Sequence, residues 1–383
     1  MSPRAYRSSW MNDELQIFGK MVAQFIQKEF VPHQATWRQQ HRPDAEAWTK
    51  AGAAGMLLCD IPEAYGGGGG TFAHEAVVLE ELARAGINFG SCIQSIVAHY
   101  ILAYGTQDQR QTWLPKMATG ELVGAIAMSE PAAGSDLQGI KTTARRGGDQ
   151  YVINGSKTFV TNGWHAGLIC LAVKTDVKAP GGRGLSLIIV ETDGLPGYHV
   201  GGILDKVGMH EQDTCELFFD GVRVPATNLL GPVEGKGFYQ MMEQLPYERL
   251  MVGVSAVATA EQAVAITAKY VKERTAFNKP LIDFQNTRFK LAECKTEAHI
   301  GRVFIDNCIE RFIAGQSDDV TTAMAKYWLT DCENRIVDEC VQLHGGYGYM
   351  SEYPIARMWA DSRVQRIYAG SNESMKELIG WSL

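Results

Sequence analysis

The apolar residues of this 383-residue chain follow two different spacings, arranged in three consecutive blocks. Between about residues 122 and 232 they form short β-branched or alternating runs such as LSLIIVE and TCELFFDGVRV, which are typical of strands. On either side they recur at the three- and four-residue spacing of helices. The chain is too long for a single core. We therefore expect an α+β protein with a helical domain over 1–121, a β domain over 122–232 and a second helical domain over 233–383, without a Rossmann crevice.

The N-terminal block contains a clear amphipathic pattern and an unusual glycine run. In NDELQIFGKMVAQFIQKEF the apolar residues from Leu15 to Ile26 share one face, Asn12 or Asp13 is expected to cap the helix, and Pro32 is expected to end it. The five glycines at 66–70 suggest either a phosphate loop or a flexible turn between helices. No G-x-G-x-x-G or Walker pattern accompanies them, so the turn is favoured.

Further local signals mark turns and helices in the other two blocks. Asn154-Gly155 predicts a β-hairpin turn. Helical spacing predicts long helices over 247–274, 286–313 and 319–343, and a final helix starting near Asn372. GGYGYMSEYP at 345–354 interrupts the last long run.

Composition and charge restrict the function classes. The net charge of -7 argues against nucleic-acid binding. The N-terminus lacks the apolar core of a secretory signal, and the longest apolar run, LMVGVSAVATA, is too short to span a bilayer. The eight cysteines show no CxxC pair and no metal-ligand spacing. We therefore expect reduced, mostly buried thiols, a cytoplasmic location, and neither a structural metal nor a membrane span.

Four segments carry residues suited to holding a polar, planar ligand. AMSEPAAGSD at 127–136 permits close backbone approach, and KTFVTNG at 157–163 places an aromatic ring two residues from a hydroxyl. KERTAFNKPLIDFQ at 272–285 supplies an arginine whose planar fork suits a diphosphate. The segment 341–380 contains two small-residue turns. Each segment alone is equally compatible with an ordinary turn, strand or surface.

The stretch LPYERL places Glu248 and Arg249 at the start of an apolar run. Pro246 suits the first turn of a helix, where a following glutamate complements the helix dipole. A catalytic role for Glu248 is the alternative interpretation.

Taken in order, these segments resemble the acyl-CoA dehydrogenase family over nearly the whole chain. The similarity lies in IPEAYGG, AMSEPAAGSD, INGSKTFVTNG, ERTAFNKPL, QLHGGYGY and IYAGSNE. DTCELFFDGVRVP, KGFYQMMEQLPYERL, MAKYW and ESMKELIG are most similar to the long-chain branch. The resemblance implies an N-terminal helical domain, a β-barrel-like middle domain and a C-terminal four-helix bundle. It also implies FAD between the last two, usually in a homotetramer.

The resemblance assigns cofactor contacts to individual residues. Met128, Ser129 and Thr161 would meet the flavin, Phe159 would pack against it, and Ser135 would lie near the phosphates or the thioester. Three residues would bind the FAD of a neighbouring subunit: Arg274, Phe277 and Gln285. Five more would surround its adenosine diphosphate part: Gln342, Gly345, Gly346, Ser371 and Glu373. Ser129 and AAGSD stand where Thr and GAGSD are frequent.

The implied reaction removes a proton from the carbon next to a thioester and a hydride from the following carbon to flavin N5. Many members carry the base in a Y-E-G turn, but this chain has Ala369 there. In the isovaleryl and long-chain branches the base precedes an arginine on a bundle helix, which identifies Glu248 as the predicted base. Apolar neighbours are expected to raise its pKa. The predicted substrate-binding residues are Ser135, Tyr239, Arg249, Ala369 and Gly370.

The resemblance implies an enzyme that oxidises acyl-CoA to trans-2-enoyl-CoA and passes electrons to an electron-transferring flavoprotein. An oxidase, an enzyme acting on acyl-carrier-protein thioesters and a catalytically silent scaffold are the alternatives. Small residues at 91, 92 and 95 leave room for a long or branched chain, but the sequence does not specify the chain itself.

Overall fold

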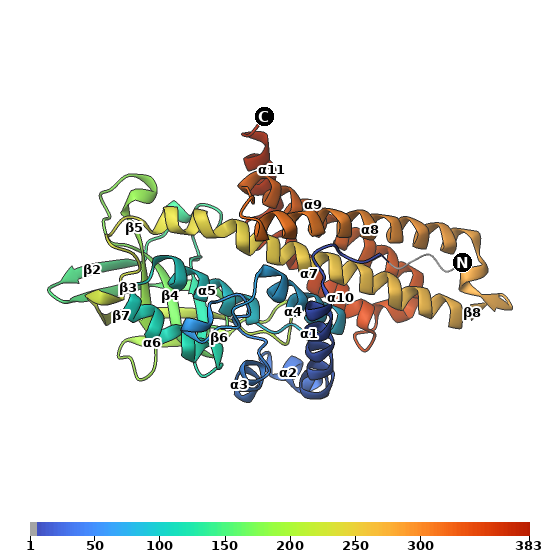
Figure 1. Ribbon diagram of the computed structural model, residues 1–383, viewed down its shortest axis with the longest axis horizontal. Coiled ribbons are helices and arrows are strands. Elements are labelled where there is room, and N and C mark those ends of the chain that lie inside the picture. Colours follow the sequence, from blue (N-terminus) through green and yellow to red (C-terminus); the bar gives the residue numbers. More distant parts are fainter. Residues whose placement is uncertain (1–5) are drawn as a thin grey trace.

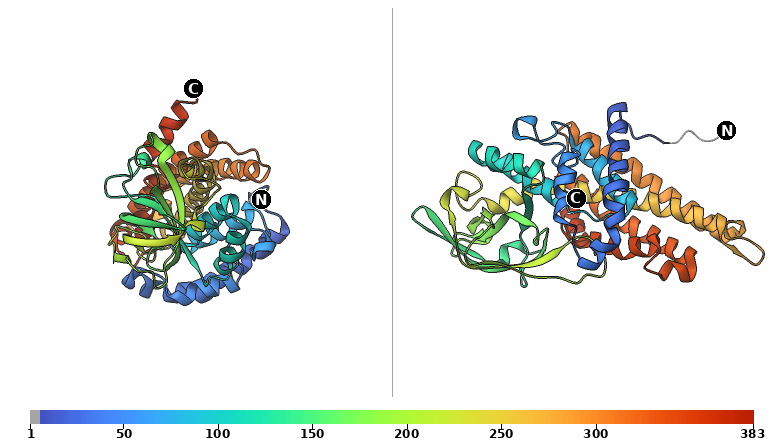
Figure 2. Two further views of the ribbon diagram at one scale, coloured as in Figure 1. Left: turned by 90° about the vertical axis from the view of Figure 1, so that its left-hand side faces the viewer. Right: turned by 90° about the horizontal axis from the view of Figure 1, so that it is seen from below.

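The computed structural model describes residues 6–383, so the first five residues of the predicted 1–121 domain lie outside the described part. The molecule is elongated, with a β domain at one end, a bundle of long helices at the other and N-terminal helices along one side (Figure 1). This helix–sheet–helix arrangement confirms the predicted α+β fold class. The right-hand view of Figure 2 shows the same separation of sheet and bundle from below.

Residues 6–121 contain six α-helices. Their bounds are Asp13–Phe25 (α1), Gln34–Gln40 (α2), Ala45–Ala53 (α3), Phe72–Ala85 (α4), Ser91–Tyr104 (α5) and Gln107–Ala118 (α6). The Asn12 side chain caps α1 by accepting from the Leu15 N–H at 2.8 Å. Leu15, Val22 and Ile26 are buried, as the apolar face predicts. The chain leaves α-helical geometry at Ile26, earlier than expected, and continues through a π-helical turn to Phe30.

The glycine run at 66–70 forms an ordered turn before α4. The N–H groups of Gly68, Gly69 and Gly70 donate to the carbonyls of residues 58, 61 and 59 within 3.0 Å. A Cβ at Gly67 would lie 2.2 Å from the Ile61 carbonyl oxygen. The glycines are therefore needed for close backbone packing, and these donors are not free for a phosphate.

The middle block forms one curled seven-stranded sheet in the order β1-β4-β2-β3-β7-β6, with β5 paired to β4. The strand bounds are Val123–Ala127 (β1), Thr143–Gly147 (β2), Gln150–Thr161 (β3), Ala166–Lys174 (β4), Leu185–Glu191 (β5), Tyr198–Ile203 (β6) and Thr214–Pro225 (β7). Their inward side chains form an apolar core inside the sheet.

The predicted hairpin at Asn154-Gly155 is wrong. Both residues lie within β3, at a register shift, and the β2–β3 turn comes earlier, around Gly148. Gly155 is needed because a Cβ there would lie 2.4 Å from the Thr142 hydroxyl oxygen. The Asn154-Gly155 dipeptide therefore forms a β-bulge, at which the segment around Thr142 packs closely against β3.

The C-terminal block contains three long helices and two short ones. Their bounds are Gly237–Glu273 (α7), Gln285–Ile313 (α8), Asp319–His344 (α9), Pro354–Ser362 (α10) and Asn372–Gly380 (α11). Two short strands, Thr275–Ala276 (β8) and Lys279–Pro280 (β9), form the hairpin between α7 and α8. α7 runs from the β domain to this hairpin at the far end of the bundle (Figure 1). The start of α11 confirms the helix predicted near Asn372.

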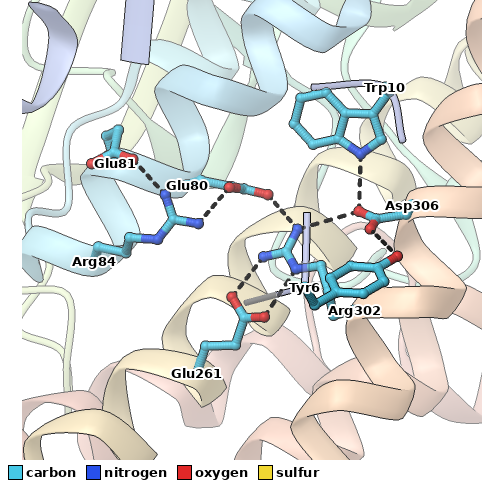
Figure 3. A network of polar contacts seen from close by, with 8 residues as sticks. All are labelled: Tyr6, Trp10, Glu80, Glu81, Arg84, Glu261, Arg302 and Asp306. Atoms are coloured by element: carbon cyan, nitrogen blue, oxygen red, sulfur yellow. Dashed lines mark hydrogen bonds and ion pairs between the residues drawn. The ribbon is translucent and has the colours of Figure 1, made fainter. Parts of the chain in front are cut away.

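A buried charge cluster ties the N-terminal block to the bundle (Figure 3). Arg302 of α8 donates to Glu80 of α4 and to Glu261 of α7, and its Nη1 lies 3.5 Å from Asp306. Asp306 also accepts from the Trp10 indole at 2.9 Å and the Tyr6 hydroxyl at 2.8 Å. One guanidinium thus joins three helices and the N-terminal segment.

Among the helices of residues 6–383, α7 alone is long and apolar enough to cross a membrane by length and composition. The short apolar run in the sequence is therefore part of a much longer helix. A helix in a protein core meets the same criteria, and more than half of this apolar segment is buried, so the observation is weak evidence for a membrane span.

All eight cysteines are free, and seven of them are buried. Within the described range, no three side chains of His, Cys, Asp or Glu come together as a possible metal site.

Candidate active site

Glu248 lies in the interior of α7, more than two turns from the start of that helix. α7 begins at Gly237, so Pro246 is inside the helix and not in its first turn, and that prediction is wrong. Dipole effects fade beyond the first turn. The dipole explanation for Glu248 is therefore removed, and burial of this carboxylate needs another reason.

The Glu248 carboxylate is buried against α5. The residue is 8% exposed, and its Oε1 accepts a 3.0 Å hydrogen bond from the Tyr100 hydroxyl. Burial raises the pKa of Glu248 to about 7, although the Tyr100 hydrogen bond and the Arg249 charge oppose that rise. A carboxylate with such a pKa is suited to accept a proton near neutral pH.

Arg249, the next residue, is also buried. It is 5% exposed, and its Nε has no hydrogen-bond partner within residues 6–383. Protein interiors rarely leave such a donor unpaired. A ligand acceptor beside α7 would satisfy it, in keeping with the predicted substrate contact.

The turn at Tyr368–Gly370 has an unusual backbone. Ala369 has φ 52° and Gly370 has φ 88°, so two successive residues adopt left-handed conformations. The Ala369 N–H donates to no acceptor of the described chain. Non-glycine residues in this conformation concentrate at functional sites.

The pKa shifts of Cys92 on α5 and Lys326 on α9 include charge effects from Glu248 and Arg249, respectively. Burial, with smaller contributions from Glu75 and Glu248, raises the pKa of Cys92 to about 12. Burial, with the charge of Cys92 next, raises the pKa of Tyr368. Cys92 is thus within electrostatic range of both Glu248 and the turn.

Lys326 of α9 lies under the same turn. Its ammonium donates to the Gly370 carbonyl at 2.6 Å. Burial, with the charge of Arg249 next, lowers the pKa of Lys326 to about 7. The turn and Arg249 therefore share one neighbouring cation.

The predicted flavin contacts from the β domain meet at the ends of β1 and β3. The Thr158 N–H donates to the Ser129 carbonyl at 3.0 Å, which joins the two strand ends. Phe159 has φ 57° and is 69% exposed at a register shift of β3. This shift breaks the simple alternation used to place Phe159 and Thr161 on one face. An exposed aromatic ring on a left-handed residue nevertheless offers a surface that a ligand could cover, in keeping with the predicted role of Phe159.

A buried ion pair that the sequence analysis did not identify organises these strand ends. Lys157 donates to Glu130 and to the Met128 carbonyl, both at 2.9 Å. The other Glu130 oxygen accepts from the Lys141 N–H at 2.6 Å. Burial lowers the pKa of Lys157 to about 8 against the opposing effect of Glu130. The sequence signal for this ion pair is a charged residue, Glu130 or Lys157, inside each of two segments of otherwise apolar or small residues.

A second cluster of predicted residues lines a pocket of about 520 Å³ at the far end of the bundle. Arg274, Gln342, Gly345 and Gly346 all contribute to its walls. The Arg274 guanidinium lies 5.4 Å from the centre of the Tyr347 ring. A cation and two glycines whose missing Cβ atoms face open space form a surface suited to a diphosphate.

Other predicted residues do not line this pocket. Phe277 is at the tip of the β8–β9 hairpin, Gln285 begins α8, and Ser135 is exposed in the loop after β1. Ser371 and Glu373 start α11, which meets α9 near Lys326, about 24 Å along the α9 axis from Gln342. One chain therefore does not bring Ser371 and Glu373 to the Arg274 pocket.

Tyr239 is likewise separate from the base. It is 47% exposed and lies about 13 Å along the α7 axis from Glu248. A contact between Tyr239 and a substrate would have to lie far from the reacting carbons.

Comparison with known families accounts for nearly all of the chain. Residues 12–121, 125–222 and 235–383 match the family models for the acyl-CoA dehydrogenase N-terminal, middle and C-terminal domains. The chain belongs to the acyl-CoA dehydrogenase family. It is therefore an oxidoreductase, as the motifs predicted.

Relatives within the acyl-CoA dehydrogenase family agree with the predicted branch. The chain is 45% identical to the mitochondrial long-chain specific acyl-CoA dehydrogenase of Mus musculus over 96% of this chain and 86% of that protein. It is 34% identical to the mitochondrial isovaleryl-CoA dehydrogenase of Solanum tuberosum over 99% and 93% of the two chains.

Solved structures of acyl-CoA dehydrogenases share the fold. The acyl-CoA dehydrogenase of Geobacillus kaustophilus is 47% identical, with a TM-score of 0.96 and coverage of 98% of this chain and 99% of that one. A glutaryl-CoA dehydrogenase of Mycobacterium smegmatis in complex with FADH2 is 26% identical, with a TM-score of 0.91 and coverage of 97% and 95%.

Proposed function

We propose that this chain is an FAD-dependent acyl-CoA dehydrogenase that converts a medium-chain, long-chain or branched acyl-CoA to the trans-2-enoyl-CoA, with Glu248 as the base. The observation that carries the proposal is the buried Glu248 carboxylate, whose pKa burial raises to about 7. The Y-E-G turn of many relatives has Ala369 in this chain, so the base must come from elsewhere.

The residues present fit FAD. Phe159, Ser129 and Thr161 offer an exposed ring and polar groups at the strand ends, and the Arg274 pocket offers a cation and open glycine backbone. A related structure holds FADH2, which supports the assignment. When bound, FAD supplies the hydride acceptor of the reaction.

Glu248 would remove the proton from the carbon next to the thioester, and its pKa is matched to that task. The substrate would also lose a hydride from the following carbon, so that a carbon–carbon double bond forms. Charge that develops on the thioester oxygen would be stabilised by the free Ala369 N–H. The small Ala369 side chain leaves space for the Glu248 carboxylate or for a substrate branch.

The acyl chain would extend toward α5. Ser91, Cys92 and Ser95 are small, and Cys92 is within electrostatic range of Glu248. Similarity to the long-chain relative supports a long or branched chain.

The two sets of predicted cofactor residues suggest an assembly. Arg274 follows the C-terminal end of α7, about 38 Å along the helix axis from Glu248. We infer that the Arg274 pocket serves the FAD of a neighbouring copy in a homo-oligomer, as the family resemblance implies for a tetramer. An electron-transferring flavoprotein is the proposed electron acceptor.

Anaerobic titration of the purified protein with acyl-CoAs of different length and branching tests this function. We expect bound FAD and loss of its absorbance with at least one acyl-CoA. If an acyl-carrier-protein thioester bleaches the flavin and no acyl-CoA does, the substrate is the acyl-carrier-protein thioester and not an acyl-CoA. In a separate aerobic assay with the same acyl-CoAs, oxygen consumption with peroxide release would indicate an oxidase. Absence of bleaching by every thioester would contradict catalysis and favour a silent scaffold.

A further inference from the structure

We propose that Lys326 is a positioning residue that holds the Ala369–Gly370 turn in the conformation that presents the Ala369 N–H to the substrate thioester carbonyl. This inference rests on the proposed function. It adds a specific structural role for a side chain outside the predicted site.

The Lys326 side chain directs its ammonium to the turn. Lys326 is 0% exposed, and its Nζ donates to the Gly370 carbonyl at 2.6 Å and to the Asn372 Oδ1 at 2.9 Å. Below its pKa of about 7 this donor is ionised, and hydrogen bonds from an ionised donor are stronger than neutral ones. One ammonium thus fixes the residue after Ala369 and the residue that begins α11.

No carboxylate of residues 6–383 lies within 4.0 Å of the Lys326 ammonium. The charges of Asp331 and Glu373 favour its charged form from a distance, while those of Arg249 and Arg366 disfavour it. A buried ammonium without a direct ion-pair partner costs stability. The Lys326 ammonium donates to the turn and to Asn372, and it forms no ion pair within the described part of the chain. Arg302, in contrast, is paired with carboxylates.

The turn needs an external support. Ala369 carries a Cβ in the left-handed region, which is unfavourable for a residue other than glycine, asparagine or aspartate. Gly370 has φ 88°, a backbone conformation in which a residue with a side chain would be strained. Loss of the Lys326 hydrogen bond would free the Gly370–Ser371 peptide, and the strained residue before it, Ala369, would no longer hold its N–H in a fixed direction.

Asn372 completes the support from the other side. Its amide donates to the Tyr327 carbonyl at 3.2 Å and to Asp331 at 3.0 Å. Because Tyr327 and Asp331 also lie on α9, Asn372 attaches the turn to the same helix that carries Lys326. α9 packs in turn along α7, which carries Glu248.

The test compares two ligands that differ only at the carbonyl. In a Glu248→Gln background, which prevents turnover, dissociation constants are measured for an acyl-CoA thioester and for the matched S-alkyl-CoA thioether by flavin absorbance or calorimetry. We expect Lys326→Met to weaken thioester binding about tenfold, the size of one lost hydrogen bond, and to leave thioether binding within about twofold. Lys376→Met removes an exposed lysine from α11 and is the matched control, with both affinities unchanged.

Lys326→Gln keeps one neutral donor and should lose less thioester affinity than Lys326→Met. It also carries the test if Lys326→Met does not fold, with circular dichroism and FAD content as checks. Equal weakening of both ligands, or no weakening of either, would overturn the positioning role. A native protein whose flavin no acyl-CoA reduces would instead overturn the proposed function, so the two failures are distinguishable.

Discussion

The Tyr100 hydroxyl donates a 3.0 Å hydrogen bond to the Glu248 carboxylate across the contact between α5 and α7. The bond stabilises the ionised form of an acid that burial pushes toward the neutral form. The balance between these two effects sets the pH at which Glu248 can accept a proton, and the first two predictions depend on it.

Glu248→Gln should lower the rate of flavin reduction by acyl-CoA by about 10² to 10⁴-fold, because an amide cannot accept the proton. The FAD content and the thermal midpoint should stay near native values. Stopped-flow absorbance measures the rate. Glu243→Gln, an exposed change on the same helix, is the matched control, and it should keep the native rate. A native rate in the Glu248 variant would remove this residue from the mechanism.

Tyr100→Phe should shift the pH dependence of flavin reduction toward higher pH. The deprotonated base is the active form, so the rate rises with pH through the Glu248 pKa of about 7. Loss of a hydrogen bond to the carboxylate raises that pKa, and we expect a shift of about one pH unit. Tyr104→Phe, which loses a bond to Glu243, is the control. A shift toward lower pH would mean that Tyr100 does not stabilise the carboxylate.

The double substitution Glu248→Ala with Ala369→Glu should recover only part of the activity. A glutamate at position 369 would stand on a residue with φ 52°, in a turn fitted to a small side chain. A displacement of about one ångström can cost a hundredfold in rate. Reduction rates of the double variant, the Glu248→Ala variant and the native protein give the comparison. Full recovery would show that the two positions are interchangeable.

Arg302→Met should destabilise the fold by about 3–5 kcal/mol, because it leaves the Asp306 carboxylate buried without a cation and Glu80 with Arg84 as its one remaining cation. Urea denaturation measures the free energy of unfolding. Arg335→Met breaks the exposed pair with Glu297 and should cost less than about 1 kcal/mol. Similar losses in both variants would contradict the role given to the buried cluster.

The block order and most long helices could be predicted because periodicity within a segment reports its own secondary structure. The start of α11 at Asn372 and the burial of Leu15, Val22 and Ile26 follow from such local patterns. The fold class follows from the order of the blocks.

Two local rules failed where tertiary contacts decided the outcome. Pro246 is tolerated inside α7, which begins at Gly237, and Asn154-Gly155 forms a bulge beside Thr142 in place of a hairpin. In both cases, long-range packing outweighed a local preference for a helix start or a turn.

The candidate site was accessible to sequence reasoning only in part. Motif similarity identified Glu248 and Ala369, but nothing local indicates that Tyr100, 148 residues earlier, reaches the carboxylate. Lys326 contacts Gly370 from 44 residues away, and its only signal is a charge within MAKYW. Such partners depend on how α5 and α9 dock against their neighbours.

The separation of about 38 Å between Glu248 and Arg274 along α7 has a genetic consequence. If each active site takes residues from two copies of the chain, two different inactive variants can together restore activity. In a mixed oligomer of a chain impaired only at Glu248 and a chain impaired only at Arg274, some active sites would combine an intact Glu248 from one copy with an intact Arg274 from the other. Co-expression of the two would then yield activity that neither produces by itself.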